Sequence, residues 1–115
     1  MFMVSLNKTL NGYGVFSDGK EVGVIEYKDF WDGMPYLSLM KIIPEFRNKG
    51  VGTKALKLFE SEMKSAGHRA VLLSTQSDEG AQHFYRKAGY SECGCLILEN
   101  SPFKQAMELF FIKTL

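Results

Sequence analysis

Up to residue 43 the chain places its apolar side chains in short runs and alternations, which is typical of β-strands rather than helices. Residues 2–6 predict a short first strand, and turn-forming residues dominate 7–14. Residues 13–16 and 21–27 predict the arms of a β-hairpin, because the Asp-Gly pair at 18–19 lies between β-type segments. No helix is predicted before residue 50.

Residues 29–35 predict a loop, and a strand follows over 36–43, which Pro44 is expected to end because it lacks a backbone donor. Strict alternation divides the side chains of this strand between two faces: Leu37, Leu39, Lys41 and Ile43 on one, and Tyr36, Ser38, Met40 and Ile42 on the other. Since both faces are largely apolar, we expect the strand to be covered on both sides.

A helix is predicted over residues 51–66, because apolar positions recur there with a period near 3.6. These positions are Val51, Ala55, Leu58, Phe59, Met63 and Ala66, and the outer side carries Lys54, Lys57, Glu60, Glu62 and Lys64. Gly67 is well placed just after the helix end. The short apolar run 70–73 then predicts a buried strand parallel to 36–43, in a right-handed βαβ unit.

A second helix is predicted to begin at Ser77 or Asp78, which are good N-caps, and to end at Ala88 before Gly89. Its inner face is expected to carry Ala81, Phe84, Tyr85 and Ala88. Residues 93–98 and 107–113 predict two final strands, in which Cys93 and Cys95 act as small apolar residues.

Residues 42–53 combine an apolar strand end, a basic glycine-rich turn and a helix start. Glycines let the backbone approach an anion, and the free N–H groups and dipole of the first helical turn favour one. Arg47 and Lys49 add full positive charges. The turn is therefore predicted to hold the pyrophosphate of a cofactor.

Composition indicates an ordinary single domain over residues 1–115, with 45% apolar and 23% charged residues. The net charge of +1 gives no general reason to expect nucleic acid or an anionic membrane as a partner. No apolar run approaches the roughly 20 residues that span a bilayer, and the first residues do not resemble a signal peptide. Two cysteines give no disulfide framework, so we expect a cytoplasmic protein.

Two segments together resemble a known family. Arg47-x-x-Gly50-x-Gly52 is similar to the acetyl-CoA motif of the GNAT N-acetyltransferases, and residues 81–90 resemble that family's Ala-x-x-Phe-Tyr-x-Lys-x-Gly-Phe segment. The resemblance covers about residues 36–113. It implies an α/β (α+β) fold with a mixed, mostly antiparallel sheet and flanking helices, in which the parallel strands 36–43 and 70–74 splay apart. The helices that usually open the family's fold have no counterpart here.

The same resemblance implies acetyl-CoA in the gap between those strands, and no metal. The backbone of Met40, Lys41 and Ile42 would pair with the pantetheine arm. The pyrophosphate would meet Arg47 and the amides of Asn48, Lys49, Gly50, Val51, Gly52 and Thr53. Asp78 stands where many members carry Asn, and a carboxylate can only accept hydrogen bonds.

Tyr85 is carried over as the general acid, because a phenol with a pKa of about 10 stays protonated at neutral pH. The alternative for Tyr85 is a core aromatic on the inner face of a helix. The acceptor, a small-molecule or peptide amine, must attack in its neutral form, so a base is expected. Glu26 is the first candidate base, with Asp32 behind it.

Several alternative interpretations of other residues and of the function remain. Phe30 and Trp31 could line an acceptor pocket, or could cover a sheet edge or a homodimer contact. A zinc site from His68, His83, Cys93 and Cys95 lacks zinc-site spacing. The main alternative to direct acetyl transfer in a ternary complex is a non-catalytic acetyl-CoA-binding regulatory module, and a structural homodimer is a third.

Overall fold

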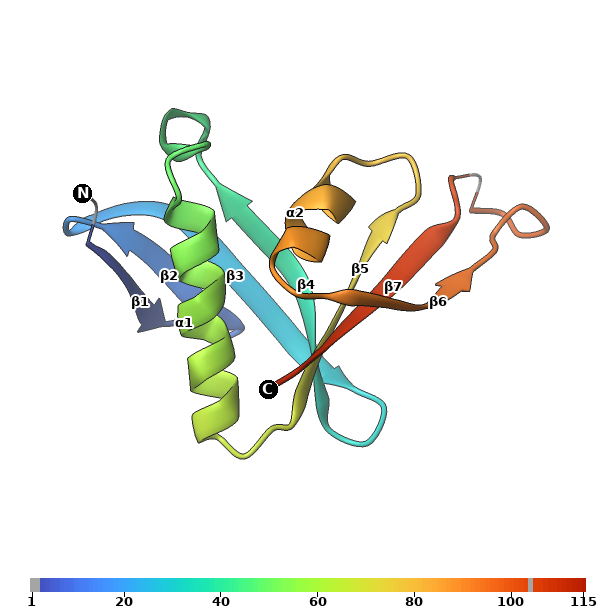
Figure 1. The fold of residues 1–115 in the computed structure, drawn as a ribbon, viewed down its shortest axis with the longest axis horizontal. Coiled ribbons are helices and arrows are strands. Elements are labelled where there is room, and N and C mark those ends of the chain that lie inside the picture. The colour runs from blue at the N-terminus through green and yellow to red at the C-terminus, as the bar shows by residue number, and fades with distance from the viewer. Residues whose placement is uncertain (1–2, 104) are drawn as a thin grey trace.

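The computed structural model describes residues 3–103 and 105–115. Within these residues, seven strands form one mixed sheet in the order β1-β2-β3-β4-β5-β7-β6, and two α-helices pack against it (Figure 1). The elements are β1 (Val4–Lys8), β2 (Gly12–Ser17), β3 (Lys20–Phe30), β4 (Met34–Ile42), α1 (Val51–Ser65), β5 (Ala70–Gln76), α2 (Ala81–Lys87), β6 (Ser91–Leu96) and β7 (Glu108–Thr114). None of the described helices is long and apolar enough to cross a membrane.

The predicted hairpin at the start of the chain is confirmed. Ser17 pairs with Lys20, and Asp18 (φ 51°) and Gly19 (φ 83°) both adopt the left-handed conformation that suits a two-residue turn. The first strand lies over Val4–Lys8, slightly later than predicted, and the predicted start at residue 2 lies outside the described residues.

The predicted loop over 29–35 is wrong. Strand β3 continues to Phe30 and β4 begins at Met34, which pairs with it, so only residues 31–33 turn. Asp32 (φ 61°) and Gly33 (φ 78°) reverse the chain within this tight turn, and the flanking residues are therefore free to pair.

A β-bulge in β4 overturns the predicted alternation of its side chains. Tyr27 pairs with Leu37 while Glu26 pairs with Leu39, so Ser38 is an extra residue on β4. Directly paired residues point to the same face of a sheet. The bulge therefore moves Met40 and Ile42 onto the face of Leu37, and moves Lys41 to the opposite face.

The first of these faces, which we call the inner face, is covered by α1, whereas the opposite, outer face of β4 is open. Leu39 is 40% exposed and Lys41 is exposed there. The expectation that β4 is covered on both sides is therefore wrong for the described residues.

Helix α1 lies over Val51–Ser65, and Gly67 (φ 96°) follows its end, as predicted. Among its apolar residues, the buried face differs from the prediction at three positions: Leu56 is 2% exposed, Leu58 is 37% exposed and Ala66 is exposed. Glu60, predicted to lie outside, is buried at 8% exposure. Its carboxylate accepts hydrogen bonds from Tyr90 and Lys113, which offset the cost of burying the charge.

The two parallel strands separate, as the family resemblance implied. Pairing between β4 and β5 consists of Tyr36 with Leu72 and Leu37 with Leu73. On its other side β5 pairs with β7 along its whole length, and beyond the fork β4 continues beside β3 (Figure 1). The fold class predicted from the resemblance is thus confirmed.

Helix α2 is shorter than predicted, and neither Ser77 nor Asp78 caps it. The helix begins at Ala81 after Gly80, while the side chain of Gln82 donates back to the Ser77 carbonyl at 3.0 Å. Residues 77–80 therefore form a separate turn. At the other end Gly89 (φ 98°) follows Ala88 as predicted.

The last two strands are close to their predicted positions, but the cysteines are not packed. Strand β6 is at the edge of the sheet, and both Cys93 and Cys95 are exposed on it. Every residue of this strand is exposed, so the apolar role expected for the two cysteine side chains is wrong.

Candidate functional site

A cavity of about 520 Å³ lies between the end of β4, the N-terminus of α1 and helix α2. Its volume is in the range of small-molecule sites, which is about 300–1,000 Å³. It is lined by Met40, Ile42, Arg47, Asn48, Gly50, Gly52, Thr53, Ala81, Phe84, Tyr85 and Lys87. The cavity thus joins the two sequence segments on which the family resemblance rests, and Figure 1 shows α2 over the opening between β4 and β5, with α1 on the other side of β4 in this view.

The N-terminus of α1 is built without a cap. Gly50 occupies the N-cap position with φ 81°, and no described side chain caps the helix there. The first turn carries no acidic residue, and the first described helical bond runs from the Lys54 amide to the Gly50 carbonyl. The amides of Val51, Gly52 and Thr53 precede that bond. They are therefore donors for an anion, and the helix dipole favours it.

The turn before α1 is held by Arg47. Its Nε donates to the Ile42 carbonyl at 2.7 Å, which folds the turn back onto the end of β4. Asn48 takes the left-handed conformation with φ 60°. Nζ of Lys49 lies 5.7 Å from the centre of the Phe46 ring, so this side chain contacts an aromatic neighbour instead of lining the cavity.

Gly52 lies between Met40 of β4 and Phe84 of α2. A Cβ atom at this position would be 3.6 Å from Cε of Met40 and 3.7 Å from Cζ of Phe84. One methyl group would fit, but a longer side chain would occupy the space between β4 and α2. The glycine therefore keeps open a cleft of the kind that an extended cofactor arm needs.

Tyr85 faces the cavity from α2. Its ring packs against Phe84 and Tyr90, with centroids 5.2 and 5.8 Å away. Burial, with a smaller contribution from the charge of Glu79, raises the pKa of the Tyr85 phenol to about 12. Tyr85 therefore both packs against the core and lines the cavity, and its hydroxyl is a proton donor throughout the neutral range.

The structure brings together eight of the predicted site residues: Met40, Ile42, Arg47, Asn48, Gly50, Gly52, Thr53 and Tyr85. Lys41 points to the outer face because of the bulge at Ser38. The side chain of Val51 is in the core at 1% exposure, although its amide belongs to the first turn of α1. Asp78 is exposed in the turn before α2.

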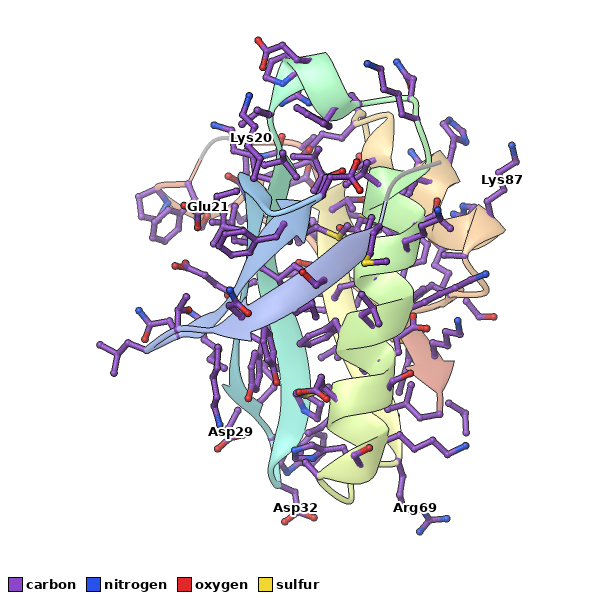
Figure 2. The ribbon with its side chains drawn as sticks, turned by 90° about the vertical axis from the view of Figure 1, so that its left-hand side faces the viewer. Lys20, Glu21, Asp29, Asp32, Arg69 and Lys87 are labelled. Atoms are coloured by element: carbon purple, nitrogen blue, oxygen red, sulfur yellow. The ribbon has the colours of Figure 1, made fainter. Side chains whose placement is uncertain are left out.

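The two candidate bases lie away from this cavity. Glu26 pairs with Leu39 on the outer face of the sheet, opposite the face that lines the cavity. Asp32 is in the β3–β4 turn, at the end of the molecule where α1 finishes, close to Arg69 (Figure 2).

Three lining residues were not predicted as site residues: Ala81, Phe84 and Lys87. The first two had been assigned to the inner face of the helix, so their position was available from periodicity. Lys87 is not among the residues predicted for the inner face, and Figure 2 shows it extending from α2.

The other candidates behave as ordinary residues. The Phe30 ring lies 5.8 Å from that of Tyr36, whereas Trp31 is 84% exposed at the tip of its turn. His83 is exposed on α2. Within residues 3–103 and 105–115, no three His, Cys, Asp or Glu side chains are grouped as metal ligands.

Comparison with known proteins gives matches over most of the chain. Residues 5–90 match the family model described as "Acetyltransferase (GNAT) family". The uncharacterized protein YxbD of Bacillus subtilis is 35% identical over 83 residues, which are 70% of this chain and 50% of that protein. N-alpha-acetyltransferase 30 of Schizosaccharomyces pombe is 32% identical over 56 residues, which are 48% of this chain and 37% of that protein. The chain thus spans half or less of the length of these relatives.

A solved structure shares the fold. The GNAT family acetyltransferase of Elizabethkingia anophelis with acetyl-CoA bound superposes with a TM-score of 0.81 at 11% identity, covering 99% of this chain and 98% of that one.

Proposed function

This chain belongs to the GNAT acetyltransferase family, and from that premise we propose that it transfers the acetyl group of acetyl-CoA to a primary amine by direct attack in a ternary complex. One observation carries the proposal. The uncapped N-terminus of α1 and the hydroxyl-bearing ring of Tyr85 face the same cavity, beside a β-strand that has left its parallel neighbour. The free amides at the N-terminus of α1 can bind a phosphate, and the Tyr85 hydroxyl can donate a proton to a leaving thiolate.

Acetyl-CoA would be held by backbone groups more than by side chains. The amides from Asn48 to Thr53, including those of Lys49 and Val51, would meet the pyrophosphate together with the Arg47 guanidinium. The backbone of Met40, Lys41 and Ile42 would pair with the pantetheine arm, since this stretch of β4 has no β5 partner. Asp78 is a further candidate contact from the turn before α2. The cofactor supplies a thioester, whose acyl carbon is open to attack by an amine.

Tyr85 would act as the general acid. Its raised pKa keeps the phenol protonated at neutral pH, so that it can donate to the departing sulfur. A covalent acyl-enzyme is not needed for this chemistry, because an amine in its neutral form is itself a competent nucleophile.

Glu26 remains the first candidate for the base that neutralises the incoming amine. It lies on the outer face of the sheet, so it would act on an acceptor that enters from the side opposite the cofactor cavity. The similarity to N-alpha-acetyltransferase 30 supports an amine acceptor. An α-amino group is a favourable one, since its pKa of about 8 leaves part of it neutral.

Cellular location and assembly follow as secondary proposals. The two exposed cysteines, Cys93 and Cys95, suit a reducing cytoplasm. A homodimer would bury Trp31, which is 84% exposed at the tip of the β3–β4 turn. Sedimentation of the wild type and of Trp31→Ser would test this assembly: equal monomeric masses for both would count against it.

The proposed function is tested by two measurements on the same protein. Isothermal titration measures acetyl-CoA binding, and a thiol-release assay over a panel of α-amines, lysine peptides and polyamines measures turnover. Binding with amine-dependent thiol release supports the enzyme. Binding without release for any amine would favour the alternative, a non-catalytic acetyl-CoA-binding regulatory module. Absence of binding would contradict both.

A further inference from the structure

A second polar cluster joins three strands at the fork of the sheet. Oη of Tyr36 on β4 lies 2.7 Å from Oγ of Ser74 on β5, and this Oγ donates to Oε2 of Glu108 on β7 at 2.6 Å. All three side chains are partly buried. None of the three was predicted from the sequence as a site residue.

The direction of these hydrogen bonds follows from the chemistry of the groups. A carboxylate can only accept, so the single hydroxyl hydrogen of Ser74 points to Glu108. Ser74 then has no hydrogen for Tyr36, and Tyr36 must donate in the bond between them. The phenolic oxygen of Tyr36 therefore has lone-pair capacity left for a further donor. An ammonium group is such a donor.

The cluster lies at the place where the two parallel strands part. Tyr36 and Leu37 are the β4 residues that pair with β5, and beyond them the strands diverge (Figure 1). Leu37 points to the inner face, so its neighbour Tyr36 points to the outer face, opposite the cofactor cavity. A group bound at Tyr36 would therefore approach the fork from the other side of the sheet.

Aromatic rings surround the phenol. The centroids of Phe30 and Phe110 lie 5.8 and 6.5 Å from that of Tyr36, and 6.5 Å from each other. Phe30 is 41% exposed, so the group is open to solvent on this side. Aromatic faces next to a carboxylate attract organic cations.

We propose that Tyr36, Ser74 and Glu108 form the acceptor subsite, which binds the substrate as an ammonium ion and carries one of its protons to Glu108. The proposal deepens the proposed function and rests on it. The subsite selects a primary ammonium attached to an apolar or aromatic group. In this proposal Glu108, rather than Glu26, is the final proton acceptor.

The proton balance has three concerted transfers. The ammonium gives a proton to Oη of Tyr36, the Tyr36 hydrogen passes to Oγ of Ser74, and the Ser74 hydrogen passes to Oε2 of Glu108. The net change is one neutral amine and one neutral carboxylic acid from one cation and one carboxylate. Tyr36 and Ser74 end as they began, and the amine nitrogen has the free electron pair that attack requires.

Among the described residues, the charged neighbours of this cluster lie on β3. Lys28 on β3 pairs directly with Tyr36 and is its basic neighbour, and Glu26 lies two residues earlier on the same strand. On the two strands that flank β7, the residues paired with Glu108 are Gln76 of β5 and Leu96 of β6, and neither side chain is ionisable.

The competing explanation is that these hydrogen bonds only stabilise the fold at the fork. The pH dependence of kcat/KM distinguishes this structural role from the proposed proton transfer. The test compares wild type, Tyr36→Phe, Glu108→Gln and Glu26→Gln, with Glu21→Gln as a control for loss of an exposed carboxylate on β3. The probe acceptor is phenethylamine, a primary amine with one aromatic ring. Circular dichroism checks that each variant is folded, and titration with acetyl-CoA checks the other side of the sheet.

For Tyr36→Phe and Glu108→Gln we expect kcat/KM at pH 7 to fall by about 100-fold, the usual scale of proton-transfer catalysis. The loss should shrink to about 3-fold at pH 10, because much of the amine then arrives neutral. Acetyl-CoA affinity should stay within about twofold, and Glu21→Gln should behave as wild type. If kcat/KM of these variants falls equally at pH 7 and pH 10, the cluster has a purely structural role and the proposal is wrong. The proposal would also be overturned if Glu26→Gln lowers kcat/KM at pH 7 and recovers at pH 10, while Glu108→Gln keeps the kcat/KM of the wild type at both pH values.

A binding measurement keeps this test separate from that of the proposed function. At pH 7 the wild type should bind phenethylammonium about tenfold more tightly than neutral phenethyl alcohol, as one charge-assisted hydrogen bond implies. Glu108→Gln should remove this preference. If no amine is acetylated, the proposed function is wrong, but the preference for phenethylammonium over phenethyl alcohol still tests whether the cluster binds an ammonium group. Equal binding of the two probes by the wild type would refute the subsite even in an active enzyme.

Discussion

The hydroxyl of Tyr90 donates to Oε2 of Glu60 at 2.8 Å, which ties the residue just after α2 to the middle of α1. Nζ of Lys113 donates to the other carboxylate oxygen at 2.9 Å and to the carbonyl of Ala88 at 2.8 Å. One buried carboxylate thus connects both helices and β7. Because residues of both helices line the cavity, we expect this network to stabilise the arrangement of its walls.

Replacing Glu60 should therefore destabilise the whole domain. Glu60→Gln leaves Lys113 without its counter-charge, and we expect the free energy of unfolding to fall by about 2 kcal/mol, as for a partly buried ion pair that loses one partner. Urea denaturation measures the change. Glu62→Gln, on the exposed side of the same helix, should stay within about 0.5 kcal/mol of wild type. Equal stabilities of the two variants would show that the network is not important for folding.

Arg47 should act through geometry as well as charge. Arg47→Lys keeps the positive charge but loses the Nε donor to the Ile42 carbonyl. We expect acetyl-CoA affinity to fall about tenfold, the scale of one hydrogen bond to a charged group. Isothermal titration measures this, with Lys57→Arg on the exposed side of α1 as the control. An unchanged affinity would mean that charge alone is required at position 47.

Tyr85→Phe should separate catalysis from binding. It removes the proposed proton donor and keeps the ring that packs against Phe84 and Tyr90. We expect kcat to fall by roughly 100-fold, with acetyl-CoA affinity within about twofold of wild type. His83→Gln, an exposed change on the same helix, provides the control. Unchanged turnover in Tyr85→Phe would remove this residue from the mechanism.

The ionisation of Tyr85 gives an independent test. Burial raises its pKa to about 12, so its tyrosinate should be absent at pH 10, where an exposed tyrosine is half ionised. Since the folded-state pKa exceeds the unfolded one, this group contributes stability that is complete below about pH 10 and is lost as the pH rises towards 12. The difference in ultraviolet absorbance between wild type and Tyr85→Phe follows the titration. A midpoint near pH 10 would contradict the buried environment.

Local signals in the sequence predicted most of the framework. The Asp18-Gly19 pair fixed the first hairpin because both residues tolerate the left-handed conformation. Gly67 and Gly89 marked helix ends for the same reason. The helical period placed Phe84 and Tyr85 on one side of α2, and the family resemblance placed that side against the turn at 47–52, where the cavity lies.

Features that depend on distant partners were missed. The bulge at Ser38 arises from the pairing of β4 with β3, and it reversed the predicted faces of Met40 and Lys41. Glu60 looked like a solvated helix residue because Lys113, its partner, is 53 positions away in the chain. The cluster of Tyr36, Ser74 and Glu108 comes from three separate strands, so no spacing in the sequence announces it.

The central claim is that the turn before α1 and helix α2 together hold acetyl-CoA. Titration of acetyl-CoA into wild type, Gly52→Ala, Gly52→Glu and Ser61→Glu tests it most directly, with folding of each verified by circular dichroism. The wild type should bind with Kd on the order of micromolar. Gly52→Ala should retain binding, because its Cβ fits at 3.6 Å from Met40. Gly52→Glu should abolish binding by placing bulk and negative charge in the cleft, while Ser61→Glu, the same charge on the exposed side of α1, should not. Wild-type protein that fails to bind acetyl-CoA, or folded Gly52→Glu that binds it as tightly as the wild type, would contradict the account.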